Sequence, residues 1–386
     1  MTSRFVRLAA PVAVATATLT AGIVSVARAA VPQAGPKWLV SGGFGSFIGG
    51  DSNVTSVASS GIKNAFAVGP RCEGSCAPST LAVLHWNGSK WVTVAPPQGF
   101  MTATSSIGTA VVATSSAWNT WVFPLVSQPT TFRTDALRYN GKHWAVVKFP
   151  ASSRIVTAAA FSAANAWAFG TTGSSGVPFN VRYNGIKWRA AYPPGDPQVL
   201  SAPAANDMWA IGPTIKTATK PQPHQVLIAM HWNGSKWRAL ALPKVRKPSF
   251  DFVVPGSIMA FGPKDVWESY ALGNFGTCCV FGGIEHWSGS KWRRLGVPYP
   301  VQQLSGMAQD GHGGLWLTVR TGTAHPLAFY HYNGGRWSRQ YPPSFVNLTP
   351  VPVELSWIPG TRFLWSGGFG NEAHGTVGLV LGYGIK

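Results

Sequence analysis

The feature that most constrains this chain is a six-residue motif that occurs six times without an insertion. Each copy reads aromatic residue, Asn or Ser, Gly, any residue, a basic residue and Trp. The copies are Trp86–Trp91, Tyr139–Trp144, Tyr183–Trp188, Trp232–Trp237, Trp287–Trp292 and Tyr332–Trp337. Asn-Gly between alternating apolar runs predicts a β-hairpin with a type I′ turn, whose two central residues both need positive φ. The glycines recur every 44 to 55 residues, and a period of about 40–50 residues is typical of four-stranded propeller blades.

A second repeated element lies upstream of each hairpin, where a polar turn precedes a strand with an aromatic residue. Its seven copies are Asn64–Gly69, Ala117–Trp121, Asn165–Gly170, Asp207–Gly212, Asp265–Trp267, Gly314–Trp316 and Arg362–Trp365. The seventh copy lacks a complete hairpin. Residues Leu379–Lys386 read as a third strand that stops in the turn, and Lys37–Val40 read as the fourth strand after it. The sequence therefore predicts an all-β, seven-bladed β-propeller with four-stranded antiparallel blades, the last one closed by the N-terminal strand.

The length of the chain fits one domain of this kind. Residues 37–386 give 50 residues to each of the seven blades, and closed all-β folds often run this long as one unit. We therefore expect residues 30–386 to form a single propeller domain.

Residues 1–29 have the pattern of a secretory signal peptide. Arg4 and Arg7 precede a run rich in Ala, Val and Thr, which ends at a small-x-small cleavage pattern over residues 27–29. A retained membrane anchor is the alternative for this segment. No later run is long and apolar enough to cross a membrane. The sequence predicts a secreted protein that is extracellular or associated with the cell wall.

The chain is strongly basic. Without residues 1–29 it has 28 Lys and Arg against 12 Asp and Glu, a formal charge of +16. Such a charge favours anionic partners, namely an anionic polysaccharide or cell-wall polymer, or nucleic acid bound without specificity. The alternative is that the charge serves solubility alone.

Four cysteines in an exported protein suggest disulfide bonds. Cys72 and Cys76 frame one short loop, so a local bridge is expected there. Cys278 and Cys279 are adjacent, so a strained bridge, free thiols or other pairings all stay open. The two pairs fall in the first and fifth blades, which argues against one metal site; neither a metal nor a cofactor is predicted.

The Trp residues that begin each fourth strand share one position of the repeat. They are Trp38, Trp91, Trp144, Trp188, Trp237, Trp292 and Trp337. They can form an array that stacks on sugars, but packing of blade against blade is favoured because large aromatic side chains bury much area between sheets.

Two polar positions also recur. The residue before each of these Trp is Lys37, Lys90, His143, Lys187, Lys236, Lys291 or Arg336. This ring of cations either protects exposed sheet edges from aggregation or binds anions. His85, Arg138, Arg182, His231, His286 and His331 share another position, where they cannot converge on a metal and are expected to make structural hydrogen bonds.

Binding residues are expected on the face that carries the loops between second and third strands, because function concentrates on loops held by a rigid scaffold. The candidate cations are Arg71, Arg133, Lys216, Lys220, Lys244, Arg246 and Lys247, and the candidate aromatic residues are Trp121, Phe275 and Tyr299. The alternative is that these loops are merely variable and solvated. The first strands are rich in small residues, and Glu354 is the exception in an axial channel that otherwise offers few acids or bases.

No catalytic motif stands out. A glycosidase needs two carboxylates beside the scissile bond, and acidic residues are few. There is no Gly-x-Ser-x-Gly elbow, no His-Glu-x-x-His pair and no phosphate-binding glycine loop. A polysaccharide lyase remains open, because its chemistry can use a Tyr or His base beside an Arg. His224, His325, His374 and Arg320 fall near the loop face.

The repeated Asn-Asp-x-Trp-Ala-x-Gly and His-Trp-Asn-Gly-x-x-Trp elements resemble the blade repeats of secreted β-propeller proteins of high-GC, actinobacterial type. The resemblance covers nearly all of residues 30–386. It implies a scaffold with a binding face and carries over no active-site residue.

Three functions follow as hypotheses for a monomeric, secreted propeller. The first is a non-enzymatic binding module for an anionic surface polymer or glycan. The second is a lyase-like enzyme acting on acidic polysaccharide, and the third is an extracellular protein-interaction scaffold. The charge and the long loops favour the first.

Overall fold

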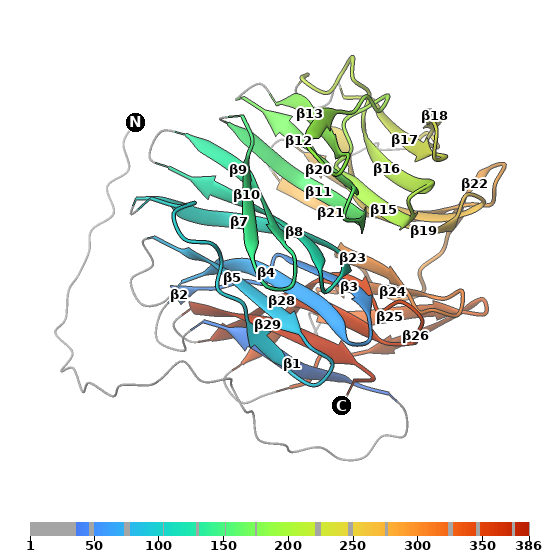
Figure 1. Ribbon diagram of the computed structural model, residues 1–386. Coiled ribbons are helices and arrows are strands. Elements are labelled where there is room, and N and C mark those ends of the chain that lie inside the picture. The colour runs from blue at the N-terminus through green and yellow to red at the C-terminus, as the bar shows by residue number, and fades with distance from the viewer. Residues whose placement is uncertain are drawn as a thin grey trace, which may run out of the picture.

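The structure is a computed structural model. It describes residues 36–45, 50–72, 78–102, 104–128, 131–150, 152–173, 176–220, 225–245, 250–274, 277–322, 327–344, 348–372 and 375–385. Within these ranges the regular elements are β-strands, and they form seven antiparallel sheets that follow one another around a ring (Figure 1). The described residues contain no helix with the length and hydrophobicity that a membrane crossing requires.

Six blades are meanders of four consecutive strands, ordered from the axis outward. Blade 1 has β3 (Ser56–Gly61), β4 (Asn64–Arg71), β5 (Thr80–Trp86) and β6 (Trp91–Thr93). Blade 2 has β7 (Ser106–Ser116), β8 (Asn119–Ser127), β9 (Phe132–Tyr139) and β10 (Trp144–Lys148). Blade 3 has β11 (Ser153–Ser162), β12 (Asn165–Thr172), β13 (Val177–Tyr183) and β14 (Trp188–Ala190).

The next three blades have the same order. Blade 4 has β15 (Val199–Ala204), β16 (Asp207–Pro213), β17 (Leu227–Trp232) and β18 (Trp237–Ala241). Blade 5 has β19 (Phe252–Gly262), β20 (Asp265–Asn274), β21 (Thr277–Trp287) and β22 (Trp292–Leu295). Blade 6 has β23 (Gln303–Gln309), β24 (Leu315–Arg320), β25 (Leu327–Asn333) and β26 (Arg336–Gln340).

Blade 7 joins the two ends of the described chain. It has β27 (Thr349–Trp357), β28 (Leu364–Glu372) and β29 (Gly375–Tyr383), and its fourth strand is β1 (Trp38–Phe44). Trp38 pairs with Tyr383 in antiparallel register, whereas the short β2 (Gly50–Asp51) pairs with β29 in parallel. The predicted seven blades and the closure by the N-terminal strand are confirmed.

The repeated hairpins are confirmed. In five of them the turn differs from the predicted type, whereas the central residues of the blade 6 turn, Gly334 and Gly335, both have the predicted positive φ. In blade 1 the glycine Gly88 has φ of 98°, whereas the described non-glycine residues with positive φ do not include an Asn. Asn87 instead stands at the corner, where its Oδ1 accepts hydrogen bonds from the backbone N–H groups of Ser89 and Lys90. The Asn therefore acts through its side chain, and the turn proper is Gly88-Ser89.

The repeated Trp residues pack blade against blade, as the sequence favoured. The second-strand aromatic residue of the preceding blade lies against the ring of Trp38, Trp91, Trp188 and Trp237. Ring centroids are 5.0 Å apart for Trp188 and Trp121 and 6.0 Å apart for Trp237 and Trp167. Because these rings fill the seams between blades, they form no exposed array.

The repeated histidines make structural hydrogen bonds within their own blades, as expected. In blades 1, 4 and 5 the Nε2 bonds the Asn or Asp at the start of the second strand, and the ring stacks on the aromatic residue two positions later. In blade 6 His331 bonds Asp310, which precedes β24, and stacks on Trp316. The pairs are His85–Asn64 at 2.8 Å, His231–Asp207 at 2.9 Å, His286–Asp265 at 2.7 Å and His331–Asp310 at 2.8 Å. Each histidine is therefore occupied locally and tied to the core.

Candidate functional site

The exposed cations predicted on the loop face gather between blades 4 and 5. Lys216 and Lys220 are exposed on the turn after β16, and Lys244 is exposed after β18. The Gln225 side chain fixes the turn, because its Nε2 donates to the carbonyl oxygens of Ala218 and Lys220 at 3.2 and 2.9 Å. Arg246 and Lys247, two further candidates, lie outside the described residues.

Two other candidate cations are tied into the protein. The Arg133 guanidinium lies 3.3 Å from the buried Asp135 carboxylate and donates to the carbonyl oxygen of Phe100 at 2.8 Å. Arg71 is partly buried at the end of β4. Their contribution to ligand binding stays a prediction.

The three aromatic candidates for ligand binding differ in where the structure places them. The interpretation of Trp121 as a ligand-binding residue is wrong, because its side chain is 1% exposed and packs between blades 2 and 3. Tyr299 is partly buried, packs on Tyr330 with centroids 5.0 Å apart and donates its hydroxyl to the Trp337 carbonyl at 3.3 Å. Phe275 lies outside the described residues.

The structure tests the cysteine predictions only in part. Cys72 is buried and disulfide-bonded. Cys76 lies outside the described residues, so the expected Cys72–Cys76 pairing stays a prediction. The side chains of Cys278 and Cys279 are also outside the described part.

Glu354, the acidic exception near the axis, has a structural partner. Its Oε2 accepts a hydrogen bond of 2.8 Å from the backbone N–H of Val57, which joins the first strands of blades 7 and 1. Burial raises the pKa of Glu354 to about 7 against these hydrogen bonds. The carboxylate thus holds the ring together at the closing seam.

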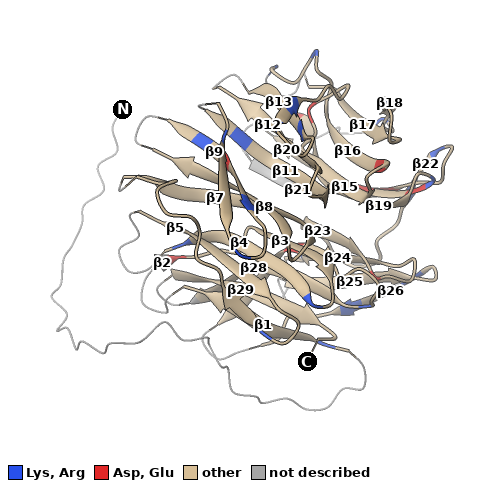
Figure 2. Ribbon diagram, in the orientation of Figure 1, with Lys and Arg blue, Asp and Glu red and all other residues tan. Residues whose placement is uncertain are grey.

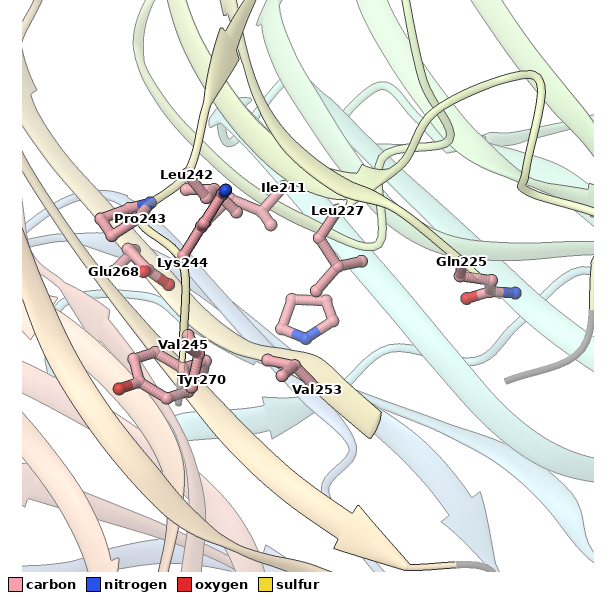
Figure 3. A pocket seen from close by; sticks show the side chains of 11 residues that line it. Ile211, Gln225, Leu227, Leu242, Pro243, Lys244, Val245, Val253, Glu268 and Tyr270 are labelled. Carbon is pink, nitrogen blue, oxygen red and sulfur yellow. The ribbon is translucent and has the colours of Figure 1, made fainter. Parts of the chain in front are cut away.

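A cavity of about 200 Å³ opens beside the exposed Lys244, at the seam between blades 4 and 5. It is lined by Ile211, Gln225, Leu227, Leu242, Pro243, Lys244, Val245, Val253, Pro255, Glu268 and Tyr270. Figure 3 shows Glu268 and Tyr270 on one side of this space, with Leu227 across it. Most of the wall is apolar, so the carboxyl group of Glu268 is the acidic feature of the lining.

Glu268 is one of two buried carboxyl groups placed side by side by the sheet register. Glu268 of β20 pairs with Glu285 of β21, which in turn pairs with Arg294 of β22. The two glutamates are 3% and 6% exposed, and directly opposed residues of an antiparallel pair have Cβ atoms about 4.5–5.5 Å apart. All three side chains therefore lie in one row on the face toward blade 4.

Tyr270 occupies the next row on the same face. Its ring lies against Gly282 and Gly283 of β21, where a Cβ would meet ring atoms at 2.4 Å and the hydroxyl at 2.8 Å. Arg294 lies beside it and donates to the carbonyl oxygen of Gly282 at 2.6 Å. The two glycines thus provide the space in which the Tyr270 ring crosses β21.

Burial is the main influence on the pKa values of Glu268, Glu285 and Tyr270. Burial, followed by the neighbouring Glu285 charge, raises the pKa of Glu268 to about 8. Burial also raises the pKa of Glu285, with Arg294 opposing the shift. The pKa of Tyr270 is raised by burial as well. At neutral pH Glu268 therefore holds a proton in the absence of a cation.

The carboxyl pair stands out against the equivalent positions of the other six blades. In those blades we compare the residue that follows the second-strand aromatic residue with its cross-strand partner on the third strand. Each such pair contains at least one apolar side chain and no charged one. The pairs are Ala67–Leu84, Val122–Leu137, Ala168–Val181, Ala210–Met230, Leu317–Tyr330 and Ser366–Leu381. Sequence reasoning missed the pair because it followed the repeat only as far as Trp267, although the next residue breaks the pattern.

A second hollow of about 460 Å³ lies at the outer seam between blades 3 and 4. Its lining includes Trp237, Lys236 and Arg182, whose guanidinium lies over the Trp167 ring at 4.9 Å. Tyr192, also part of the lining, is 85% exposed. This groove, defined by the hollow between blades 3 and 4, combines exposed aromatic surface with basic groups.

Acidic and basic side chains are distributed differently over the described residues. The buried acidic residues are Asp135, Asp196, Glu268, Glu285 and Asp310, whereas Asp51 and Asp251 are the exposed acidic residues of the described part. Lysine and arginine are exposed in every blade, on turns and outer strands (Figure 2). The excess positive charge of the sequence therefore faces solvent.

Comparison with known proteins identifies the fold and no family. No family model matches the chain, and no curated protein matches it in sequence. Among solved structures, the BP39L lectin from Burkholderia pseudomallei matches with a TM-score of 0.52 and 11% identity, over 87% of this chain and 97% of the lectin. A polysaccharide lyase, the PL25 ulvan lyase bound to GlcA(1-4)Rha3S, gives 0.53 and 10%, over 86% and 96%. YCF48 bound to D1 peptide gives 0.52 and 13%, over 92% and 97%; such identities show the fold alone.

Proposed function

We propose that this protein is a secreted, monomeric, non-enzymatic binding module for an anionic surface polymer or glycan. The observation that carries the proposal is the separation of charge: five acidic residues of the described part are buried, while lysine and arginine face solvent in all seven blades. A surface of one sign attracts polymers of the opposite sign. The signal-peptide pattern of residues 1–29 is the basis for expecting the protein outside the cell.

The groove between blades 3 and 4 is the proposed docking place for such a polymer. Tyr192 and the edge of Trp237 offer apolar ring surface, and Lys236 and Arg182 stand beside them. An aromatic face suits the C–H face of a sugar ring. The neighbouring cations suit the carboxylate, sulfate or phosphate groups of an acidic polymer.

The structural likenesses are compatible with this proposal. A lectin and a polysaccharide lyase share the propeller fold, and the lyase structure contains a sulfated, glucuronate-containing ligand. The fold can therefore present sites for acidic sugars in other proteins. For this chain the argument rests on its own surface.

A binding panel tests the proposal. Full-length protein is titrated with teichoic-acid-bearing wall, acidic polysaccharides, duplex DNA and neutral glycans across a salt series. We expect acidic glycan binding that partly survives salt, since exposed charge pairs alone are screened within about 10 Å at 0.1 M salt. Tyr192→Ala is expected to weaken it about 3- to 10-fold, the usual worth of one aromatic contact.

Two lysines at the same position of the repeat provide a matched control. Lys236 lines the groove, whereas Lys291 precedes Trp292 in blade 5. Lys236→Ser is expected to weaken binding more than Lys291→Ser. Equal losses, with binding of every polyanion abolished by salt, would mean that charge alone acts; absence of binding to all polyanions at low salt would refute the proposal.

A lyase-like activity on acidic polysaccharide is the second candidate, because Tyr270 lies beside Arg294 at the loop-face cavity. The raised pKa of Tyr270 is the wrong direction for a base. We therefore expect no ultraviolet-absorbing unsaturated product when the protein is incubated with acidic polysaccharides. Product formation that Tyr270→Phe abolishes would replace the binding proposal with the enzymatic one.

A further inference from the structure

The cavity between blades 4 and 5 contains a buried carboxyl group to which the described residues donate no hydrogen bond. Glu268 is 3% exposed and lines the cavity. Within the described part of the chain, no hydrogen bond or ion pair reaches its carboxyl oxygens. Polar groups buried at this level are normally hydrogen-bonded, so the group faces the cavity in need of a partner.

The fold does not require a carboxyl group at this position. The equivalent residues in the neighbouring blades are Ala210 and Leu317, which complete the core without charge. Burying a carboxyl group without compensation is unfavourable, and a second one beside it adds repulsion. A ligand that pairs with Glu268 supplies the compensation that the fold itself lacks.

The chemistry of the lining selects the ligand class. Ile211, Leu227 and Leu242 provide apolar walls, and Glu268 provides an acceptor that becomes negative on ionisation. An anion cannot act as the counter-ion of an ionised Glu268. Ca²⁺ needs about 6–8 oxygen ligands, and the described residues contain no cluster of three or more His, Cys, Asp or Glu side chains that could hold a metal.

We propose that the cavity binds a primary ammonium group on a short alkyl stem, with Glu268 as its counter-ion. The apolar walls take the stem, while the ammonium group donates to the carboxylate. The volume of about 200 Å³ is below the roughly 300–1,000 Å³ of pockets that enclose a whole small ligand. The occupant is therefore one amine substituent of a larger molecule.

The charged groups around Glu268 determine the net charge of this site. Glu285 of β21 adds negative charge, and Arg294 of β22 offsets it from the far side. Tyr270 lines the cavity as a neutral group, and from blade 4 the charged residue of the lining is Lys244, which is exposed at the rim. A bound ammonium replaces the proton that Glu268 holds, so binding releases a proton.

The test titrates full-length protein calorimetrically with n-butylamine near pH 7, with n-butanol as the neutral isostere. We expect the amine to bind at least about tenfold tighter than the alcohol, because a charge-assisted hydrogen bond is worth more than a neutral one. Buffers of different ionisation enthalpy are expected to report the release of about one proton. The inference does not depend on the polyanion proposal, because the probe is a small cation.

Three variants localise the effect. Glu268→Gln keeps the shape and is expected to weaken amine binding at least about tenfold. Glu285→Gln, a substitution outside the lining, is expected to weaken it much less, because Glu285 acts only through its charge. Lys244→Ala removes a like charge from the rim and is expected to strengthen binding about twofold, a gain that damaged folding cannot produce.

The opposite results would overturn the proposal. They are equal binding of butanol and butylamine, unchanged binding by Glu268→Gln, displacement of the amine by Ca²⁺, or no detectable heat from the amine at its highest usable concentration. Thermal unfolding of each variant confirms that a loss of binding does not reflect a loss of fold.

Discussion

Blades 4 and 5 share nearly every repeated contact, yet they differ at the centre of their second and third strands. Both have the histidine–aspartate hydrogen bond, His231–Asp207 and His286–Asp265, and both have a Trp pair across the hairpin, with centroids 5.7 and 5.5 Å apart. Between these common features blade 4 places Ala210 opposite Met230, whereas blade 5 places two glutamates opposite each other.

The difference separates what the fold needs from what it tolerates. An apolar pair satisfies the packing of a blade, since it fills the seam without a polar group that needs a partner. Local departures from the pattern that stabilises a fold are expected at functional sites. Blade 5 therefore keeps its fold and departs from the apolar pattern of its second and third strands where the cavity opens.

The largest effect is expected from moving the carboxyl pair into a blade that lacks it. Ala168 and Val181 of blade 3 pair in the same register and are buried. Ala168→Glu combined with Val181→Glu is expected to lower the free energy of unfolding by about 3–5 kcal/mol or more, because no partner awaits either carboxylate. Urea unfolding at neutral pH measures the loss.

The exposed Ala190 of β14 provides the control for this transplant. Ala190→Glu is expected to change stability by less than about 0.5 kcal/mol. If the two glutamates lower the free energy of unfolding by less than about 1 kcal/mol, any blade would tolerate such a pair. The pair in blade 5 would then not indicate a functional site.

A smaller effect of opposite sign is expected when blade 5 is returned to the apolar pattern. Glu268→Leu combined with Glu285→Met keeps similar volumes and removes the need to desolvate two carboxyl groups. We expect the free energy of unfolding to rise by about 1–4 kcal/mol, as for other buried ionic groups replaced by apolar ones. Denaturant unfolding with an unchanged m-value checks this, and a destabilised variant would show that the pair is a structural element of blade 5.

The last effect, which is small for each single pH unit, is a dependence of stability on pH. The pKa of Glu268 is about 8 in the folded protein against an ordinary 4.5, so the native state retains a proton that the unfolded chain releases. The stability contributed by this proton is complete below about pH 4.5 and is lost as the pH rises to about 8, by at most about 1.4 kcal/mol per pH unit.

Comparison of wild type with Glu268→Gln isolates this contribution. Asp196 and Glu354, whose pKa values burial raises to about 7, titrate alike in both proteins and cancel. The free energies of unfolding of the two proteins are expected to diverge between about pH 5 and pH 8. Parallel curves would mean that Glu268 ionises freely in the fold.

The fold was predictable because its signals repeat. Six hairpins, seven aromatic strands and the two half-hairpins at the ends of the propeller determine the blade number and the closing strand. The turn type was not predictable from Asn-Gly alone. The Asn87 side chain competes with the backbone for the same N–H groups and moves the turn by one residue.

The candidate site was less accessible from sequence. In blade 2 the repeat could be aligned on Trp118 or on Trp121, and only the structure shows that Trp118 is 64% exposed while Trp121 fills the seam. Lys244, a predicted loop-face residue, lines the cavity between blades 4 and 5, and its role in binding stays a prediction. Glu268 was not predicted as a site residue, because it is unusual only through its cross-strand partner Glu285. Only the strand register places the two glutamates side by side.

The closure of blade 7 also ties the fold to the order in which the chain is made. β1 is synthesised first among the strands, and its pairing partner β29 is synthesised last. Until then β1 has no neighbour in its blade, and Trp38 lacks the Tyr383 ring that packs beside it 5.3 Å away. A chain that stops before residue 375 would form six blades and leave an unpaired strand edge, a ready template for aggregation. Closure of the ring therefore requires that β29 is present to pair with β1.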